Sequence, residues 1–257
     1  MSDNELSRLL HAVCDTAGEI LHGIVERGGA GERDGQYALD LAVDGPVIEL
    51  LQAAGLGVLS EEAGAIDLAA DRVAVLDPVD GSTNASLFLP WYATSICVVD
   101  EHGPLHSMVV NHGTGTRYEA VRGAGATRDG VELERPEQVP LADSVIAVNG
   151  APPPDGRWAQ FRCFGASALD LSALAAGQFG AYVDFDVDAH GVWDYLGAQL
   201  VCTEVGVLIA DAFDRDLVVL EHDSRRTPVA ATTPEVLEEL VALRRSLHPD
   251  RSTRAGL

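Results

Sequence analysis

Residues 73–84 read Val-Ala-Val-Leu-Asp-Pro-Val-Asp-Gly-Ser-Thr-Asn. The first four form an unbroken apolar run, which predicts a short strand that is buried on both faces. This strand delivers two carboxylates, Asp77 and Asp80, into a turn that contains Gly and Ser. Two carboxylates this close cannot both stay ionised without a compensating charge. Hard oxygen ligands beside free backbone N–H groups suit Mg²⁺ and a phosphate, so the stretch fits a metal–phosphate site. An ordinary Asp-rich turn is the alternative that this stretch alone leaves open.

Two other segments carry carboxylates at the ends of predicted elements. Ser60-Glu61-Glu62 ends an apolar strand upstream, and Trp193-Asp194 opens an apolar helix downstream. An aspartate at a helix start is usually a cap, so Asp194 by itself indicates little. Together with Asp77 and Asp80, however, these residues form a set of acidic groups that a fold could bring together.

The apolar patterns along the chain predict an α/β protein with two parts. In the first half, residues 3–27 form a helix that Gly28-Gly29 ends, residues 30–38 form a loop, and residues 44–54 form a second helix. Its strands form an antiparallel sheet and fall at 57–60, 73–76, 92–99, 105–111 and 117–122. The second half alternates strands at 144–149, 181–185 and 207–210 with helices at 168–176, 193–205 and 234–246. We therefore expect an N-terminal half, 1–140, and a C-terminal half, 141–257, within one compact unit.

The charge balance excludes some partners. The 257 residues carry a formal net charge of −23, and all 17 basic residues are arginine. Such an acidic surface repels nucleic acids and anionic membranes, so neither is expected as a partner. No apolar run is long enough to span a bilayer, which favours a cytoplasmic protein. The four cysteines are far apart, and we expect them to be reduced, buried thiols.

The three acidic segments, in this order and spacing, resemble the inositol monophosphatase family. That family has an upstream Gly-Glu-Glu, a central Asp-Pro-Ile-Asp-Gly-Thr-Thr-Asn and a distal Trp-Asp. Residues 165–170, Gly-Ala-Ser-Ala-Leu-Asp, resemble its Gly-Ser-Ala-Ala-Leu-Asn stretch, and residues 120–126 resemble its Ala-Xaa-Xaa-Gly-Xaa-Gly-Ala turn. The resemblance extends over roughly residues 5–245. It implies the αβαβα layered sandwich of the sugar phosphatases, with the active site in a cleft between the two halves.

The resemblance also implies a magnesium-dependent phosphate monoester hydrolase. One Mg²⁺ would be bound by Glu61, Asp77 and the carbonyl of Val79, and a second by Asp77, Asp80 and Asp194. Two such ions activate water and stabilise the leaving alkoxide, with inversion at phosphorus. Ser82 would work with Glu61 to orient the attacking water.

For the substrate, the resemblance implies a wall of backbone and polar groups. The backbone N–H groups of Gly81 and Ser82 would hold phosphate oxygens. Hydroxyl groups of the substrate would meet residues drawn from three segments: Asp80, Gly165, Ala166, Ser167 and Asp184. Lithium sensitivity and a homodimer are further implications of the family.

Three departures from the family pattern stand out. Ser60 replaces a glycine, and the threonine of a Thr-Xaa-Xaa-Asp element is missing before Asp44. The resemblance also implies a third, weaker metal site, which would use Glu61 and Asp44. Because the threonine is missing, the presence of this site stays open. The segment between Asp184 and Trp193 is also longer than usual, and we expect its His190 to be exposed in a loop.

Other classes of hydrolase and phosphate-binding protein match the sequence less well. A haloacid-dehalogenase-type phosphatase needs its two aspartates two residues apart, whereas Asp77 and Asp80 are three apart and would point to opposite faces of a strand. The chain has no Gly-Xaa-Ser-Xaa-Gly elbow, so a serine hydrolase is not indicated. It also has no lysine, which a P-loop requires, so a P-loop is excluded. A non-catalytic binding protein on this fold stays open.

The substrate also stays open. The pattern favours inositol monophosphate or a related cyclitol phosphate. Fructose 1,6-bisphosphate, histidinol phosphate, adenosine 3′,5′-bisphosphate and dinucleotide phosphates are the alternatives.

Overall fold

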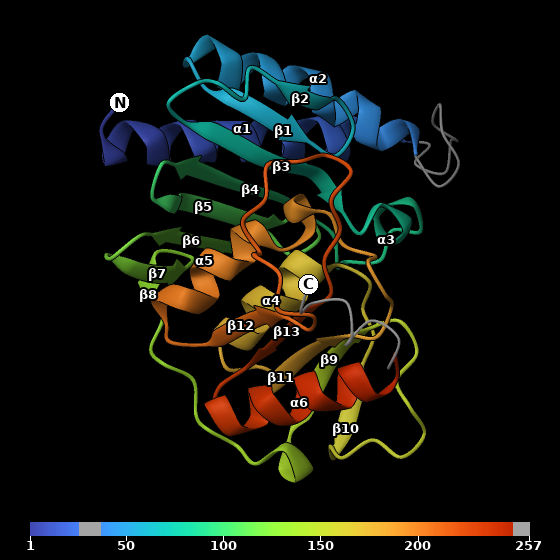
Figure 1. Cartoon of the computed structure of the whole chain (residues 1–257). Helices are drawn as coiled ribbons and strands as arrows, with labels where there is room; N and C mark the ends of the chain where they lie inside the picture. Colours follow the sequence, from blue (N-terminus) through green and yellow to red (C-terminus); the bar gives the residue numbers. More distant parts are fainter. Residues whose placement is uncertain (26–36, 249–257) are drawn as a thin grey trace.

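The computed structural model describes residues 1–25 and 37–248, which form five layers (Figure 1). Two N-terminal helices cover the outer face of a large sheet, two more helices separate it from a smaller sheet, and a last helix covers the other side of that sheet. This is the predicted αβαβα sandwich. The helices are α1 (Asp3–Gly23), α2 (Ala38–Ala53), α3 (Ser82–Ser86), α4 (Ser167–Ala175), α5 (Leu196–Glu204) and α6 (Pro234–Ser246), with 3-10 turns at η1 (Leu141–Asp143) and η2 (Val192–Asp194).

The large sheet has eight strands in the order β2-β1-β3-β4-β5-β6-β7-β8. All its pairs are antiparallel except one: β1 runs parallel to β3. The expectation of a wholly antiparallel sheet was therefore wrong at this pair, because the chain leaves β1 through the short strand β2 and returns beside it. The strands are β1 (Gly57–Ser60), β2 (Gly64–Ile66), β3 (Val73–Asp80), β4 (Ala93–Asp100), β5 (Gly103–Asn111), β6 (Arg117–Val121), β7 (Gly125–Arg128) and β8 (Val131–Glu132).

The smaller sheet has five strands in the order β10-β9-β11-β13-β12. It is mixed: β9 pairs in parallel with β10 and β11, and β13 pairs antiparallel with β11 and β12. The strands are β9 (Val145–Asn149), β10 (Gln160–Arg162), β11 (Ala181–Asp184), β12 (Leu208–Asp211) and β13 (Pro228–Ala231).

Strand β3 lies between β1 and β4 in the large sheet and is buried along its whole length. Its side chains alternate between two hydrophobic cores, as the period of two in a strand requires. Ala74 and Leu76 pack in the core beneath α1 and α2, whereas Val73 and Val75 pack in the core that holds α4 and α5. Helices on both faces explain why the strand reads as a continuous apolar run.

Several predicted elements have different bounds in the structure. Helix α2 begins six residues earlier than predicted, at Ala38, where the carboxylate of Asp40 accepts the N–H of Tyr37 at 2.9 Å and caps the helix. The predicted helix 193–205 is divided, because Tyr195 has φ −131° and separates η2 from α5. The predicted first helix, 3–27, was too long, because α1 ends at Gly23 and Ile24 is extended. Gly28-Gly29 and most of the predicted loop 30–38 lie outside the described residues.

The cysteine prediction needs one correction. Cys14, Cys97 and Cys202 are buried free thiols, but Cys163 is exposed because it follows β10, an edge strand whose three residues are all exposed. Among the described residues, no helix is both long and apolar enough to cross a membrane.

Candidate active site

The two aspartates of the opening stretch lie at the end of β3. Asp77 is 1% exposed and Asp80 7% exposed. The pairing of β3 with β4 shifts register between them, so the simple alternation of side chains is broken. The expectation that they would point to opposite faces was therefore wrong, and both carboxylates join one cluster. The N–H of Val79 donates to the Asp77 carboxylate at 3.0 Å, and this hydrogen bond stabilises the backbone where the register shifts.

The cluster is completed from the second half of the chain. Asp194 lies in η2, and one carboxylate oxygen each from Asp77, Asp80 and Asp194 lies within 4.8 Å of the others. Helix α4 also points its N-terminus here: the N–H groups of Ser167 and Ala168 donate to the two oxygens of Asp80 at 3.2 Å and 2.7 Å. These hydrogen bonds connect the end of β3, in the large sheet, to helix α4, which lies between the two sheets.

Glu61 follows β1 and approaches the cluster from the side. Its N–H donates to the carbonyl of Leu76 at 3.1 Å, and its carboxyl group lies within hydrogen-bonding reach of Asp77. The hydroxyl of Ser60, the residue that replaces glycine, donates to Asp44 at 2.5 Å. This contact accounts for one oxygen of the Asp44 carboxylate, the group expected at the third metal site.

Burial raises the pKa of all four carboxyl groups, and repulsion within the cluster raises the pKa of Glu61, Asp77 and Asp80 further. Burial, together with the charges of Asp194 and Glu62, raises the pKa of Glu61 to about 9. Burial and the charge of Asp194 raise the pKa of Asp80 to about 7, although the N–H groups of α4 oppose this shift. The pKa of Asp77 is raised well above its usual value by burial and by Glu61, and burial also raises the pKa of Asp194.

This donor set fits a hard divalent cation. All the donors are carboxylate oxygens, and they repel one another when ionised. Asp77 and Asp80 are buried, and Asp194 is half-buried. A divalent cation is the group that lets such carboxylates ionise together, and oxygen ligands are those that Mg²⁺ prefers. The donor chemistry therefore supports the predicted metal site.

The turn after Asp80 has little space. Gly81 has φ +83°, and a Cβ there would lie 3.0 Å from the carbonyl oxygen of Trp91 and 3.0 Å from Cβ of Ala166. Asn84, in α3, donates its amide to the carbonyls of Trp91 and Phe164 at 2.8 Å and 2.6 Å. Ser82 begins α3, and Gly81, which precedes it, lies directly against the segment that holds Gly165 and Ala166.

The other residues expected at the substrate wall divide into two groups. Ser167, at the start of α4, lies beside Asp80. Asp184 is instead completely buried, and one of its oxygens accepts the amide of Asn149 and the N–H of Asp186, both at 3.0 Å. His190 was expected to be exposed, and this was wrong: it is 5% exposed, because the long loop folds inward and places its ring between Asp184 and Ser167.

One element of the site had no signal in the sequence. The connection between β12 and β13, residues 212–227, crosses from the smaller sheet to the large one, and Figure 1 shows it in orange-red beside β3. We call it the strap. His222 of the strap contacts the carbonyl of Glu61 at 3.0 Å and stacks on Trp193 with ring centres 4.9 Å apart. The guanidinium of Arg225 lies 5.1 Å from the centre of the same ring. The strap therefore links Glu61 to the turn that carries Asp194.

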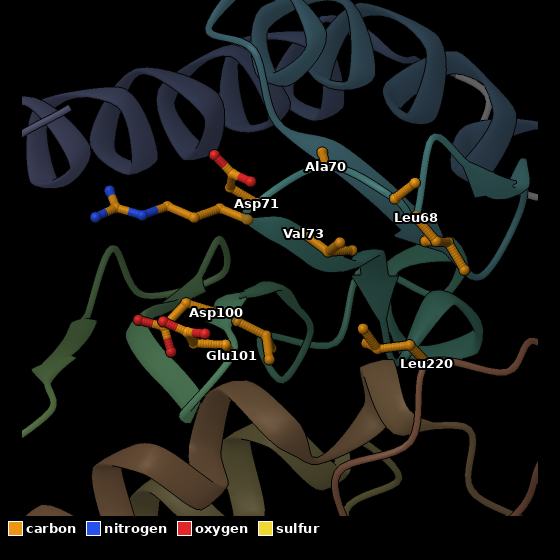
Figure 2. Close-up of a pocket in the computed structure, with 10 residues that line it drawn as sticks. Leu68, Ala70, Asp71, Val73, Asp100, Glu101 and Leu220 are labelled. Carbon is orange, nitrogen blue, oxygen red and sulfur yellow. The ribbon is translucent and has the colours of Figure 1, made fainter.

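A separate pocket of about 720 Å³ lies away from these carboxylates (Figure 2). In the figure, Asp71, Asp100 and Glu101 lie toward one end, and Leu68 and Leu220 toward the other. None of the cluster residues lines this pocket. It therefore adds nothing to the chemistry of the carboxylate site.

The fold and the site together define a five-layered α/β protein with a buried carboxylate cluster suited to a divalent cation. Comparison with known proteins gives the family: the Inositol monophosphatase family matches residues 4–248. The chain belongs to that family, and the prediction that it is an enzyme of the phosphatase class is confirmed at this level.

The relatives have several names. An inositol-1-monophosphatase, ImpA, of Mycolicibacterium smegmatis is 28% identical over 92% of this chain and 93% of its own. A fructose-1,6-bisphosphatase of Pyrococcus furiosus is 25% identical over 80% of this chain and 82% of its own. The Nus factor SuhB of Pseudomonas aeruginosa is 27% identical over 76% of this chain and 81% of its own.

A solved structure agrees with the fold. A hypothetical protein from Pyrococcus horikoshii, with similarities to inositol-1 monophosphatase, superposes with a TM-score of 0.85 at 22% identity. The match covers 94% of this chain and 98% of that one. It supports the architecture and leaves the substrate open.

Proposed function

We propose that this protein hydrolyses the phosphate monoester of a small polyol, with inositol monophosphate or a related cyclitol phosphate as the preferred substrate. The observation that carries the proposal is the cluster of buried Asp77 and Asp80 with half-buried Asp194, beside Glu61, in a chain of the inositol monophosphatase family. Two Mg²⁺ ions are proposed, held by Glu61, Asp77, Asp80, Asp194 and the carbonyl of Val79. When bound, such ions polarise the phosphate and lower the pKa of water.

The chain's own groups position the reactants. Helix α4 holds both oxygens of Asp80 and so orients that carboxylate toward the cluster. Gly81 lets the chain turn closely enough for the first N–H groups of α3 to meet phosphate oxygens. Glu61 and the Ser82 hydroxyl are proposed to orient the attacking water, since a carboxylate and a hydroxyl can each accept one of its protons.

The test of this proposal is phosphate release from a panel of phosphorylated metabolites. The panel contains inositol 1-phosphate, fructose 1,6-bisphosphate, histidinol phosphate and adenosine 3′,5′-bisphosphate, each with Mg²⁺ or with EDTA. We expect release only with Mg²⁺ and fastest with inositol 1-phosphate. Fastest release from fructose 1,6-bisphosphate would instead assign the function of the Pyrococcus furiosus relative.

A second candidate function comes from the relatives named Nus factor SuhB. In that case the fold would serve as a partner in a larger assembly and not as a catalyst. Measurable Mg²⁺-dependent turnover that EDTA abolishes would favour the enzyme, whereas tight Mg²⁺ binding without turnover on any substrate would favour the assembly role. A homodimer and inhibition by lithium are also part of the proposal, to be checked by light scattering and by phosphate release in LiCl.

A further inference from the structure

A side-chain hydroxyl takes part in the large sheet at the point where the pairing of β3 with β4 shifts register. Between Asp77 and Asp80, two residues of β3, Pro78 and Val79, face only Thr94 of β4. The hydroxyl of Thr94 donates to the carbonyl of Pro78 at 2.8 Å. Thr94 is completely buried, so this contact lies in the interior of the protein. The hydroxyl therefore holds the peptide that the bulge inserts between the two aspartates.

That peptide group is held at both of its ends. The carbonyl of Pro78 and the N–H of Val79 belong to one planar trans unit, since no cis peptide bond occurs among the described residues. The N–H end donates to Oδ1 of Asp77 at 3.0 Å. A rotation of the peptide plane that broke the contact with Thr94 would also move the N–H group that Asp77 accepts. The Thr94 hydroxyl therefore acts on the orientation of the Asp77 carboxylate.

His112, which follows β5, holds the same hydroxyl from the other side. Its Nε2 atom lies 2.8 Å from Oγ1 of Thr94. The single hydrogen of that hydroxyl goes to Pro78, so Nε2 must be the donor in this contact. The side chain is anchored as well, because His112 is 6% exposed and its backbone N–H donates to the carbonyl of Tyr92 at 3.0 Å. The imidazole is thus an N–H donor with a fixed direction.

Helix α1 leaves room for this imidazole. A Cβ at Gly18, a buried residue inside the helix, would lie 3.1 Å from Nδ1 and 3.4 Å from Cε1 of His112. Glycine in the middle of a helix is less stabilising than alanine, and the close approach of the ring gives this glycine a structural reason. The position of His112 is therefore built into the packing of α1 on the large sheet.

The hydrogen bonds of this chain of groups all point the same way. They run from His112 to Thr94, then through the 78–79 peptide to the Asp77 carboxylate. Hydrogen bonds that are aligned in series polarise one another and become stronger. We call these groups the relay: His112, Thr94 and the 78–79 peptide. The relay thus directs one buried donor after another toward a carboxylate of the cluster.

We propose that Thr94 and His112 are positioning residues of the metal site: through the relay they hold Asp77 in the orientation that binds a divalent cation. The inference rests on the proposed function, which supplies the cation, and neither residue is proposed as a ligand. Thr94 and His112 also lie outside the segments that resemble motifs of the family. The relay is therefore an inference from the contacts of this chain.

Calorimetric titration of Mg²⁺ into the metal-free protein is the direct test, because it needs no substrate. Thr94→Val removes the hydroxyl and keeps the branched shape of the side chain. We expect it to weaken Mg²⁺ binding about tenfold, the effect of one lost hydrogen bond. Thr94→Ser keeps the hydroxyl and should bind Mg²⁺ within about twofold of the wild type, because the contact with Pro78 can still form.

His112 is tested by a second pair of variants. His112→Phe keeps a ring beneath Gly18 but removes the donor to Thr94. Mg²⁺ binding should weaken about threefold, less than in Thr94→Val, because the Thr94 hydroxyl can still donate to Pro78. His112→Gln should recover binding close to that of the wild type, since its amide can donate to Thr94.

Two substitutions in and beside the smaller sheet control for a general loss of stability. Ile146→Val removes one methyl group from a completely buried side chain of β9 and should lower the melting temperature, as Thr94→Val does. Thr232→Val, directly after β13, removes a buried hydroxyl for which the described part of the chain offers no hydrogen-bond partner. Both variants should bind Mg²⁺ as the wild type does.

Phosphate release adds a readout that separates positioning from folding. In a Mg²⁺ activation curve, Thr94→Val should raise the half-saturating Mg²⁺ concentration about tenfold and keep kcat within about threefold at saturating Mg²⁺. This split is expected because the relay acts on the binding of the cation. A purely structural role would lower the amount of folded enzyme, and so the maximal rate, at an unchanged half-saturating concentration.

Three results would overturn the inference. One is Mg²⁺ binding by Thr94→Val that equals that of the wild type. The second is Thr94→Ser binding as weakly as Thr94→Val, which would assign the effect to shape and not to the hydroxyl. The third is an equal weakening in Ile146→Val, which would assign it to stability.

The proposed function can fail separately from the relay. If the wild type binds Mg²⁺ but releases phosphate from no member of the panel, the proposed function fails, and the calorimetric comparison of the variants still decides the inference. A wild type that binds no Mg²⁺ would refute the inference together with the proposed metal site.

Discussion

At the scale of single residues, Gly81 shows how the site depends on backbone conformation. Its φ of +83° favours glycine, and a Cβ would meet the backbone of Trp91 at 3.0 Å. We expect Gly81→Ala to lower the free energy of unfolding by about 2–3 kcal/mol, the sum of conformational strain and a contact that cannot relax freely. Phosphate release should fall as well, because Asp80 immediately precedes the turn. Chemical denaturation and activity assays measure the two effects.

Gly115 provides the matched control for this prediction. It has φ +80°, and a Cβ there would meet no atom within 4 Å. Gly115→Ala should therefore cost only the conformational strain, about 1 kcal/mol, and leave activity unchanged. Equal losses in the two variants would mean that the close packing around Gly81 is unimportant.

Residue types were predictable at the site, but their surroundings were not. The chemistry of the turn pointed to Asp77 and Asp80, whereas Glu61 and Asp194 could be named only because their segments resemble motifs of the family. His190 could not be placed, because only the tertiary fold shows that its loop turns inward and that Asp184 is buried to receive it.

At the scale of elements, the strap is the feature that joins the two sheets at the site. His222 contacts the Glu61 carbonyl and the ring of Trp193. We expect His222→Ala to raise the half-saturating Mg²⁺ concentration and to lower kcat/KM about tenfold, since about 1–1.5 kcal/mol of positioning contacts is lost. A Mg²⁺ activation curve measures the effect.

The control for the strap is His102→Ala, a substitution in the exposed turn between β4 and β5. It should leave the Mg²⁺ activation curve of the wild type unchanged. A curve for His222→Ala that matches this control would show that the strap does not position Glu61.

Most elements were predictable for a simple reason: each buries one apolar face or lies between two layers, and this leaves a period in the sequence. Strand β3 and helix α6 are examples. The strap lacks such a period because it crosses the molecule as an irregular connection, so its partners depend on contacts that only the fold defines.

At the scale of the whole molecule, the carboxylate cluster should make stability depend on pH and on metal. Glu61 and Asp80 have folded pKa values of about 9 and 7, above their ordinary values of 4.5 and 3.8. A carboxyl group whose pKa is higher in the folded state makes its full contribution to stability below its unfolded pKa. This contribution is lost as the pH rises through the folded pKa. In EDTA, we therefore expect the melting temperature to fall between about pH 5 and pH 9.

Mg²⁺ should reverse this loss because it binds the ionised carboxylates. At a concentration 100 times its Kd it would add about 2.7 kcal/mol. In EDTA, Asp77→Asn should show a smaller decrease in melting temperature with pH, because one buried charge is gone. Melting curves that coincide with and without Mg²⁺ across this range would contradict the account.

We propose that the carboxylate cluster forms a metal-dependent phosphatase site, and a comparison of three phosphate-release assays can test this. Phosphate release from inositol 1-phosphate is compared for the wild type with Mg²⁺, the wild type with EDTA, and Asp77→Asn with Mg²⁺. We expect turnover in the first case and a loss of at least about a thousandfold in the other two, because the proposed mechanism would need both the Asp77 carboxylate and the cation. Turnover that persists in EDTA, or that Asp77→Asn retains in full, would contradict it.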